Sequence, residues 1–276
     1  MKLETVTGVL VWYSAGVPAG RSFVSSLFRC KKRTGQSSKV YLSKEAVDDL
    51  MWWRALMVVA HSDPNLIAAS ISSVRRNREA SLFLTTDACK IVGGGGFLSD
   101  SYDGVAITMP DNMFRWTREE ISCFIEMNVS INVLEYYTAV YFIMLWVEVC
   151  EGKVIHVKCD NTSAVSWLTK SRSKIPAADT LAKIFSLFCL THNISVISTH
   201  FRGVYNGVAD KFSRDIDLCN QEADEEVAHG DLLPSCTRKE LCRRLLSKCV
   251  TRPSKVHGEE ILQILTLLRR TRSNGI

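Results

Sequence analysis

Four carboxylates stand out by their positions in the sequence rather than by their type. Asp87 and Asp160 each end a short run that is typical of a β-strand. Glu135 lies near the start of a long apolar segment, and Asp210 lies at the start of a predicted helix. An Asp at a strand end is commonly a turn former or a helix cap. Glu135 is harder to explain in this way, because a carboxylate buried without a partner is costly.

Taken together, the four carboxylates predict a metal centre. Functional groups in an α/β sheet gather at strand ends where the chain order switches. Adjacent strands would bring Asp87 and Asp160 together, and helices crossing that edge would add Glu135 and Asp210. Carboxylates this close repel one another unless cations bind, and oxygen-only ligands suit Mg²⁺ or Mn²⁺ and disfavour zinc. Two such ions, about 3.5–4 Å apart, clamp the attacking and leaving oxygens of a phosphodiester. The predicted chemistry is metal-dependent hydrolysis of a nucleic-acid backbone.

The elements that must position these residues predict an α/β fold. In chain order they are strands at 81–87, 93–98 and 105–108, a helix at 131–150, a strand at 154–159, helices at 161–169 and 177–190, a strand at 194–199 and a helix from 208. The first three strands form a predicted antiparallel meander, and helical crossovers make the later strands parallel. We therefore expect a mixed sheet with helices on both faces, preceded by a small helical segment.

Three zones divide the chain in this interpretation. Residues 1–80 read as helical, and Ser43 is a candidate cap for the helix that follows it. Residues 81–214 hold the α/β elements. Residues 215–276 begin as an acidic linker and continue as a basic tail with small helices. A tail that touches nucleic acid is the alternative for this last zone.

Composition limits the class of protein. Of 276 residues, 46% are hydrophobic and 23% are charged, which excludes a wholly disordered chain. The net charge of +5 permits a nucleic-acid partner without demanding one. None of the ten cysteines is spaced as C-x-x-C, so the usual zinc pattern is missing and we expect reduced thiols in an intracellular protein. The most apolar stretch, 136–147, is too short to span a bilayer, so we expect no membrane partner. The sequence does not distinguish nucleus from cytoplasm.

The motifs around the carboxylates resemble the ribonuclease H domain of reverse transcriptases, in particular that of DIRS-like (tyrosine-recombinase) retrotransposons. The segments that carry the resemblance are Thr86-Asp87-Ala88, the glycine-rich run 93–96, Ile131-Asn132-Val133-Leu134-Glu135, Cys159-Asp160-Asn161 and HFRGVYNGVADKFSR at 200–214. Four motifs in this order are fairly specific. The resemblance covers about half of the chain and implies a ribonuclease H-like fold.

The resemblance also implies roles for individual residues. The ligands of two Mg²⁺ or Mn²⁺ ions would be Asp87, Glu135, Asp160 and Asp210. His200 matches a histidine that assists proton transfer or product release, and a surface loop histidine is the alternative. Asn161 and Asn206 would contact substrate or brace the site, and a simple cap or turn role is the alternative for either. Cys159 stands where the family usually has Ser.

The activity implied is endonucleolytic hydrolysis of the RNA strand of RNA–DNA hybrids. Segments before residue 80 are similar to the thumb and connection region of the same polyproteins, but no Y-x-D-D motif is present, so we expect no polymerase activity. The implied partners are an RNA–DNA hybrid or another nucleic acid, with a separate polymerase chain as a further candidate.

Two other classes of function stay open. The first alternative to the nuclease is a catalytically silent, domesticated or degenerate remnant that binds nucleic acid or protein. The second is a structural subunit that packs on a separate polymerase chain. A large exposed apolar patch around Trp52 and Trp53 would favour the structural subunit.

Overall fold

The computed structural model describes residues 2–33, 41–62, 79–107, 109 and 111–214. These residues form two compact units, one within 1–78 and the other starting at Glu79. The predicted linker and tail at 215–276 lie outside the described residues. Among the described residues, no helix combines the length and the apolar character needed to cross a membrane.

The first unit is helical. Its elements are α1 (Leu3–Tyr13), the 3₁₀ helix η1 (Pro18–Phe23), α2 (Ser25–Arg33) and α3 (Lys44–Ser62). Ser43 precedes α3 and its hydroxyl accepts a hydrogen bond from the Ala46 N–H at 3.3 Å, which confirms the predicted cap.

The tryptophans of α3 form the core of the first unit. Trp52 and Trp53 are only 2% and 3% exposed. Trp52 stacks on Phe23 with ring centroids 4.0 Å apart, and the Trp53 indole N–H donates to the Phe23 carbonyl at 3.1 Å. The two rings are therefore buried, but other apolar side chains of α3, including Met51, Met57 and Val58, are exposed around them. The structural subunit stays an untested alternative.

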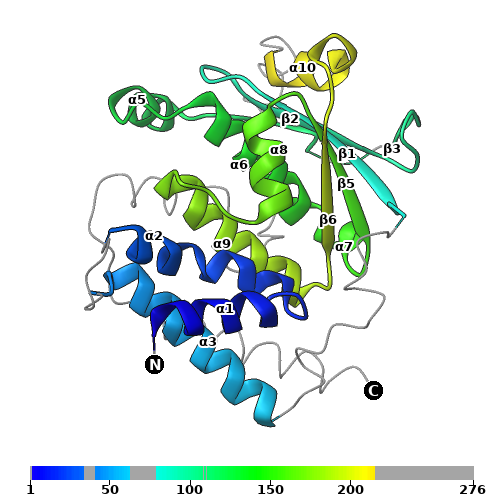
Figure 1. Ribbon diagram of the computed structural model, residues 1–276. Helices are drawn as coiled ribbons and strands as arrows, with labels where there is room; N and C mark the ends of the chain where they lie inside the picture. Colours follow the sequence, from blue (N-terminus) through cyan, green and yellow to red (C-terminus); the bar gives the residue numbers. More distant parts are fainter. Residues whose placement is uncertain (1, 34–40, 63–78, 108, 110, 215–276) are drawn as a thin grey trace. The chain divides into compact units, whose positions relative to one another are not determined.

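The second unit is a mixed α/β sheet with helices (Figure 1). Its strands are β1 (Leu82–Ala88), β2 (Gly93–Ser99), β3 (Ala106–Ile107), β4 (Met113–Arg115), β5 (Val154–Cys159) and β6 (Ser195–His200). Its helices are α5 (Arg118–Glu126), α6 (Ile131–Leu145), α7 (Val147–Cys150), α8 (Thr162–Lys170), α9 (Pro176–Thr191) and α10 (Gly207–Arg214), with the 3₁₀ turn η3 (Gly203–Tyr205).

Strand order confirms the predicted mixture of antiparallel and parallel pairs. The sheet runs β3-β2-β1-β5-β6, and β4 pairs with β2 as well. The pairs of β2 with β1, β3 and β4 are antiparallel, whereas β1–β5 and β5–β6 are parallel. The parallel pairs bring together residues that are 73 positions apart in the chain for β1 and β5 (Leu82 and Ile155) and 41 for β5 and β6 (Val154 and Ser195).

Two elements of the second unit were not predicted. The strand β4 is only three residues long, and it forms because the glycine strand β2 offers it an edge. The helix α5 begins after Thr117 with a complete capping box, in which Thr117 and Glu120 exchange side-chain and backbone hydrogen bonds. The pattern of a Thr followed three residues later by Glu was present in the sequence. The single helix predicted at 131–150 is divided at Trp146 into α6 and α7.

The glycines of β2 allow helices to approach the sheet from both sides. Successive residues of a strand point to opposite faces. A Cβ built on Gly96 would lie 2.7 Å from the Phe142 ring of α6, and one built on Gly95 would lie 2.4 Å from the Cβ of Phe212 in α10. The backbone of β2 is thus the contact surface for α6 on one face and α10 on the other.

We predict that Gly95→Ala destabilises the protein by about 1–3 kcal/mol, the usual cost of overpacking. The added methyl group would also meet the carbonyl oxygen of Ala209 at 2.8 Å, and backbone atoms cannot swing aside as a side chain can. Urea unfolding measures the change. Gly207→Ala is the matched control, because nothing lies within 4 Å of its Cβ position. Equal stability of the Gly95 variant and the wild type would contradict this account of α10 packing.

Candidate active site

Asp87 and Asp160 come together through the parallel pairing of β1 and β5. The register pairs Thr85 with Lys158, and the same register two residues further along places Asp87 beside Asp160. Asp87 is the penultimate residue of β1 rather than its end, and Asp160 follows the last residue of β5 directly. The two strand ends therefore bring two carboxylates together, as expected from the sequence.

Glu135 enters this site from α6. Ser130 caps the helix by accepting a hydrogen bond from the Asn132 N–H at 3.2 Å, which puts Glu135 in the second turn. The carboxyl group of Glu135 is 4% exposed and accepts hydrogen bonds from the Cys159 thiol at 3.8 Å and from the Ala88 N–H. Burial, together with the charges of Asp87 and Asp160, raises its pKa to about 9. The sequence analysis expected a partner for the buried Glu135, and the Cys159 thiol and the Ala88 N–H at the strand ends are its partners.

The carboxylate of Asp87 is also buried, at 3% exposure. Burial raises its pKa, and the nearby charges of Asp160 and Asp210 raise it further. The Ser213 hydroxyl donates a hydrogen bond to it and, with the charge of Arg214, acts in the opposite direction. Asp87 therefore lies within electrostatic reach of the other three predicted carboxylates, Glu135, Asp160 and Asp210.

Asp210 carries its own counter-charge. It lies in α10 and its Oδ1 is 2.6 Å from Nη2 of Arg214, one helical turn later. The Asp210 side chain is 42% exposed, so it stands at the open side of the cluster. The sequence shows Ser213 and Arg214 only as parts of a motif. In the folded helix, Ser213 contacts Asp87 and Arg214 contacts Asp210.

The tightest group of potential metal ligands includes a thiol. One ligand atom each of Glu135, Cys159 and Asp160 lies within 4.8 Å of the other two. The sulfur of Cys159 thus lies beside the expected oxygen ligands and is directed toward Glu135. Burial raises the pKa of Cys159 well above its ordinary value, so the thiol is protonated and donates. The carboxylate oxygens remain the donors for a cation, and such donors fit Mg²⁺ or Mn²⁺.

The loop after β6 closes over Asp160. A Cβ built on Gly203 would lie 3.0 Å from the Asp160 Oδ2, so a side chain at this position would press on the carboxylate. Asn206 is 2% exposed, and its amide N–H donates to the Thr86 carbonyl at 3.1 Å, next to Asp87. Its Oδ1 is buried and has no partner among the described residues. Asn206 therefore braces the loop against β1.

Asn161 acts as a helix cap. Its Oδ1 accepts hydrogen bonds from the N–H groups of Ser163 and Ala164 at the start of α8, and its Nδ2 donates to the Asn132 Oδ1 at 2.7 Å. The capping alternative is thus the one that these contacts support, and the amide links α8 to α6 beside the carboxylates.

His200 is the last residue of β6, is exposed, and pairs in register with Cys159. It therefore lies on the strand next to the one that leads into Asp160. An exposed histidine at this position is compatible both with proton transfer at the site and with the surface alternative.

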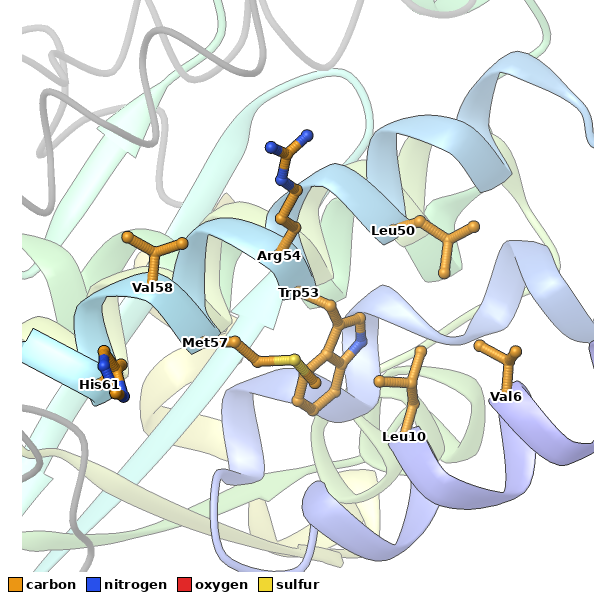
Figure 2. A pocket seen from close by; sticks show the side chains of 8 residues that line it. All are labelled: Val6, Leu10, Leu50, Trp53, Arg54, Met57, Val58 and His61. Carbon is orange, nitrogen blue, oxygen red and sulfur yellow. The ribbon is translucent and has the colours of Figure 1, made fainter. Parts of the chain in front are cut away.

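A separate apolar groove of about 480 Å³ lies between α1 and α3 (Figure 2). Trp53 and Met57 of α3 face Leu10 of α1 there. The lining contains no carboxylate, thiol or hydroxyl group. The chemistry predicted from the sequence therefore belongs to the carboxylate cluster and not to this groove.

Comparisons with known proteins add no information on the site. No protein-family model, curated protein or solved structure matches this chain. Any function for the cluster must therefore be argued from its residues and geometry.

We predict that the metal-free protein loses stability as the pH rises. Glu135 has a pKa of about 9 when folded against an ordinary value of 4.5, so between these values the folded chain holds a proton that the unfolded chain has released. The free energy of unfolding then falls by up to about 1.4 kcal/mol per pH unit, and the effect is absent below the lower value. Burial of Asp87 acts in the same direction.

Urea unfolding in the presence of a chelator, across this pH range, measures the slope. Glu135→Gln should flatten it, whereas Glu126→Gln, an exposed residue of α5, should leave it unchanged. A wild-type slope that is flat, or one that the Glu135 variant retains in full, would show that Glu135 titrates normally.

Proposed function

We propose that this chain is a metal-dependent endonuclease of the ribonuclease H type, which hydrolyses the RNA strand of RNA–DNA hybrids. The observation that carries the proposal is that Asp87 of β1 lies within electrostatic reach of three other carboxylates, which come from α6, the end of β5 and α10. The order of an antiparallel β1–β2–β3 meander followed by parallel β5 and β6 supports a ribonuclease H-like fold.

Asp87, Glu135, Asp160 and Asp210 would hold Mg²⁺ or Mn²⁺. When bound, two such ions supply an activated water and stabilise the charge that develops on the phosphate and the leaving oxygen. Three of the four side chains are held by the protein itself: Glu135 by Cys159 and Ala88, Asp87 by Ser213, and Asp210 by Arg214. These contacts orient the oxygens before any cation arrives.

The electrostatics of the cluster favour a cation. Without one, burial and mutual repulsion keep Glu135 protonated near neutral pH. A divalent ion would favour the charged forms of all four carboxylates, because opposite charge at close range lowers the pKa of a carboxyl group. Binding would therefore release protons.

Neighbouring groups would serve the substrate. His200 is exposed on the strand beside β5 and would assist proton transfer at the leaving oxygen. Asn206, with its unpaired buried Oδ1, would brace the loop next to the reacting phosphate. The sequence has no Y-x-D-D motif, so we propose no polymerase activity for this chain.

A catalytically silent binding module is the second candidate, and the Arg214–Asp210 ion pair favours it. A guanidinium 2.6 Å from Asp210 neutralises one of the four charges without any metal. A site in which Arg214 already neutralises Asp210 needs less cation to fold, and it could bind nucleic acid without turnover. The two candidates differ in one measurable property, the metal-dependent cleavage of the RNA strand.

We predict that the protein cuts the labelled RNA strand of an RNA–DNA hybrid in Mg²⁺ or Mn²⁺. Asp160→Asn should lower the rate by at least on the order of 10²-fold, because a metal ligand contributes several kcal/mol to the transition state. Asp48→Asn in α3 is the matched control and should cut like the wild type.

Equal cutting by the Asp160 variant and the wild type would mean that a contaminating nuclease or another site is responsible. Hybrid binding without cutting, by a wild-type protein shown to be folded, would overturn the nuclease and favour the silent module.

A further inference from the structure

A row of aromatic rings lies on the face of the sheet opposite α6. We call it the aromatic strip, and it consists of His156, Phe83, Tyr102, Phe201 and Tyr205. Neighbouring ring centroids are 5.3 Å apart for His156 and Phe83, 5.8 Å for Phe83 and Tyr102, 6.4 Å for Tyr102 and Phe201, and 6.1 Å for Phe201 and Tyr205. The row is therefore continuous from His156 in β5 and Phe83 at the start of β1 to the loop after β6.

Strand alternation explains why these rings share a face. Leu84, Ile155 and Val157 point into the core beneath α6, so their neighbours Phe83 and His156 point the other way. Tyr102 comes from the connection between β2 and β3, and Phe201 follows β6.

The strip is accessible along its length. Tyr205 is 71% exposed and Tyr102 is 41% exposed, while His156, Phe83 and Phe201 are half-buried. Exposed aromatic rings that adjoin one another are unusual on a surface without a binding role. The His156 ring is fixed by a 2.8 Å hydrogen bond between its Nε2 and the Thr199 hydroxyl.

A cation lies within the strip. The ammonium of Lys158 is 4.7 Å from the centroid of Tyr102 and 4.9 Å from that of Phe201, and it donates to the Tyr102 carbonyl. Arg202, directly after Phe201, is exposed. The carboxylate of Asp103 is the acidic group near Lys158. Lys158 is only 5% exposed, so its ammonium holds the two rings together, whereas Arg202 offers a basic group that a phosphate can reach. Aromatic rings beside an exposed basic group match a strand that carries bases and phosphates in alternation.

The strip leads to the carboxylate cluster. His156, Lys158 and Asp160 are alternate residues along β5, so they follow one another on the same face toward the strand end. At the far end Tyr205 is followed by Asn206, which is bonded to the Thr86 carbonyl beside Asp87. A strand lying on the rings would pass directly to the acidic edge.

We propose that the aromatic strip binds single-stranded nucleic acid, with bases stacked on Tyr102, Phe201 and Tyr205 and phosphates near the exposed Arg202. The choice of nucleic acid as the occupant rests on the function proposed for the adjoining cluster. The binding itself needs neither metal nor turnover. The strip would hold the single strand that continues from a hybrid at the cutting site.

The test is binding of a fluorescent single-stranded oligonucleotide to the full chain in a chelator, measured by anisotropy. Removing one stacking ring weakens binding by roughly 5- to 150-fold. Tyr205→Ala and Tyr102→Ala should each weaken it within that range, and Tyr41→Ala, 84% exposed in the first unit, should not change it. Circular dichroism verifies that each variant is folded.

The proposal that the strip binds single strands would be overturned if both folded variants bound the oligonucleotide with wild-type affinity, or if the wild type did not bind it. Cleavage of the hybrid is a separate readout of the cluster. If binding depends on Tyr102 and Tyr205 but the protein never cuts the hybrid, the strip is supported and the nuclease is rejected. If the protein cuts the hybrid but the two variants bind the strand as the wild type does, the nuclease is supported and the strip is rejected.

Discussion

The burial of two carboxylates side by side is the constraint on which the second unit depends. Glu135 and Asp87 are both nearly inaccessible, and each raises the free energy of the charged form of the other. Placing charge there is tolerable only where hydrogen-bond donors surround it. The Ala88 N–H and the Cys159 thiol serve Glu135, and Ser213 serves Asp87. These donors come from β1, β5 and α10, so the site exists only when all three are in place.

The glycine run of β2 makes this arrangement possible. Gly94 and Gly96 lie against Thr138, Phe114 and Phe142, while the backbone at Gly95 lies against α10. Side chains at these positions would push α6 and α10 away from the sheet. Since Glu135 lies on α6 and Asp210 on α10, the missing side chains of β2 set the distance between carboxylates that are 75 residues apart in the chain. The glycine run therefore lets α6 and α10 pack close enough to the sheet to bring their carboxylates to the cluster.

The carboxylates gather at the end of β5, and the ammonium of Lys158 lies within the aromatic strip. The acidic cluster includes one close guanidinium, Arg214, whereas the ammonium of Lys158 is held between rings two residues before Asp160. Burial lowers the pKa of Lys158 and of His156, and it raises those of Asp87 and Glu135. Cation affinity is thus concentrated at the strand end, and the aromatic strip beside it offers stacking surface. The nucleic acid proposed as substrate would use both kinds of contact.

Periodicity and residue type were enough to predict the long elements and the four carboxylates, because strands of alternating residues and a 15-residue apolar helix are local properties. The parallel register that puts Asp87 beside Asp160 followed from the order of strands and helices. The sequence did not reveal β4, the burial of Trp52 and Trp53, the thiol of Cys159 at Glu135 or the aromatic strip. Each of these depends on contacts between residues distant in the chain, whose free energies appear only when the sheet and its helices have packed.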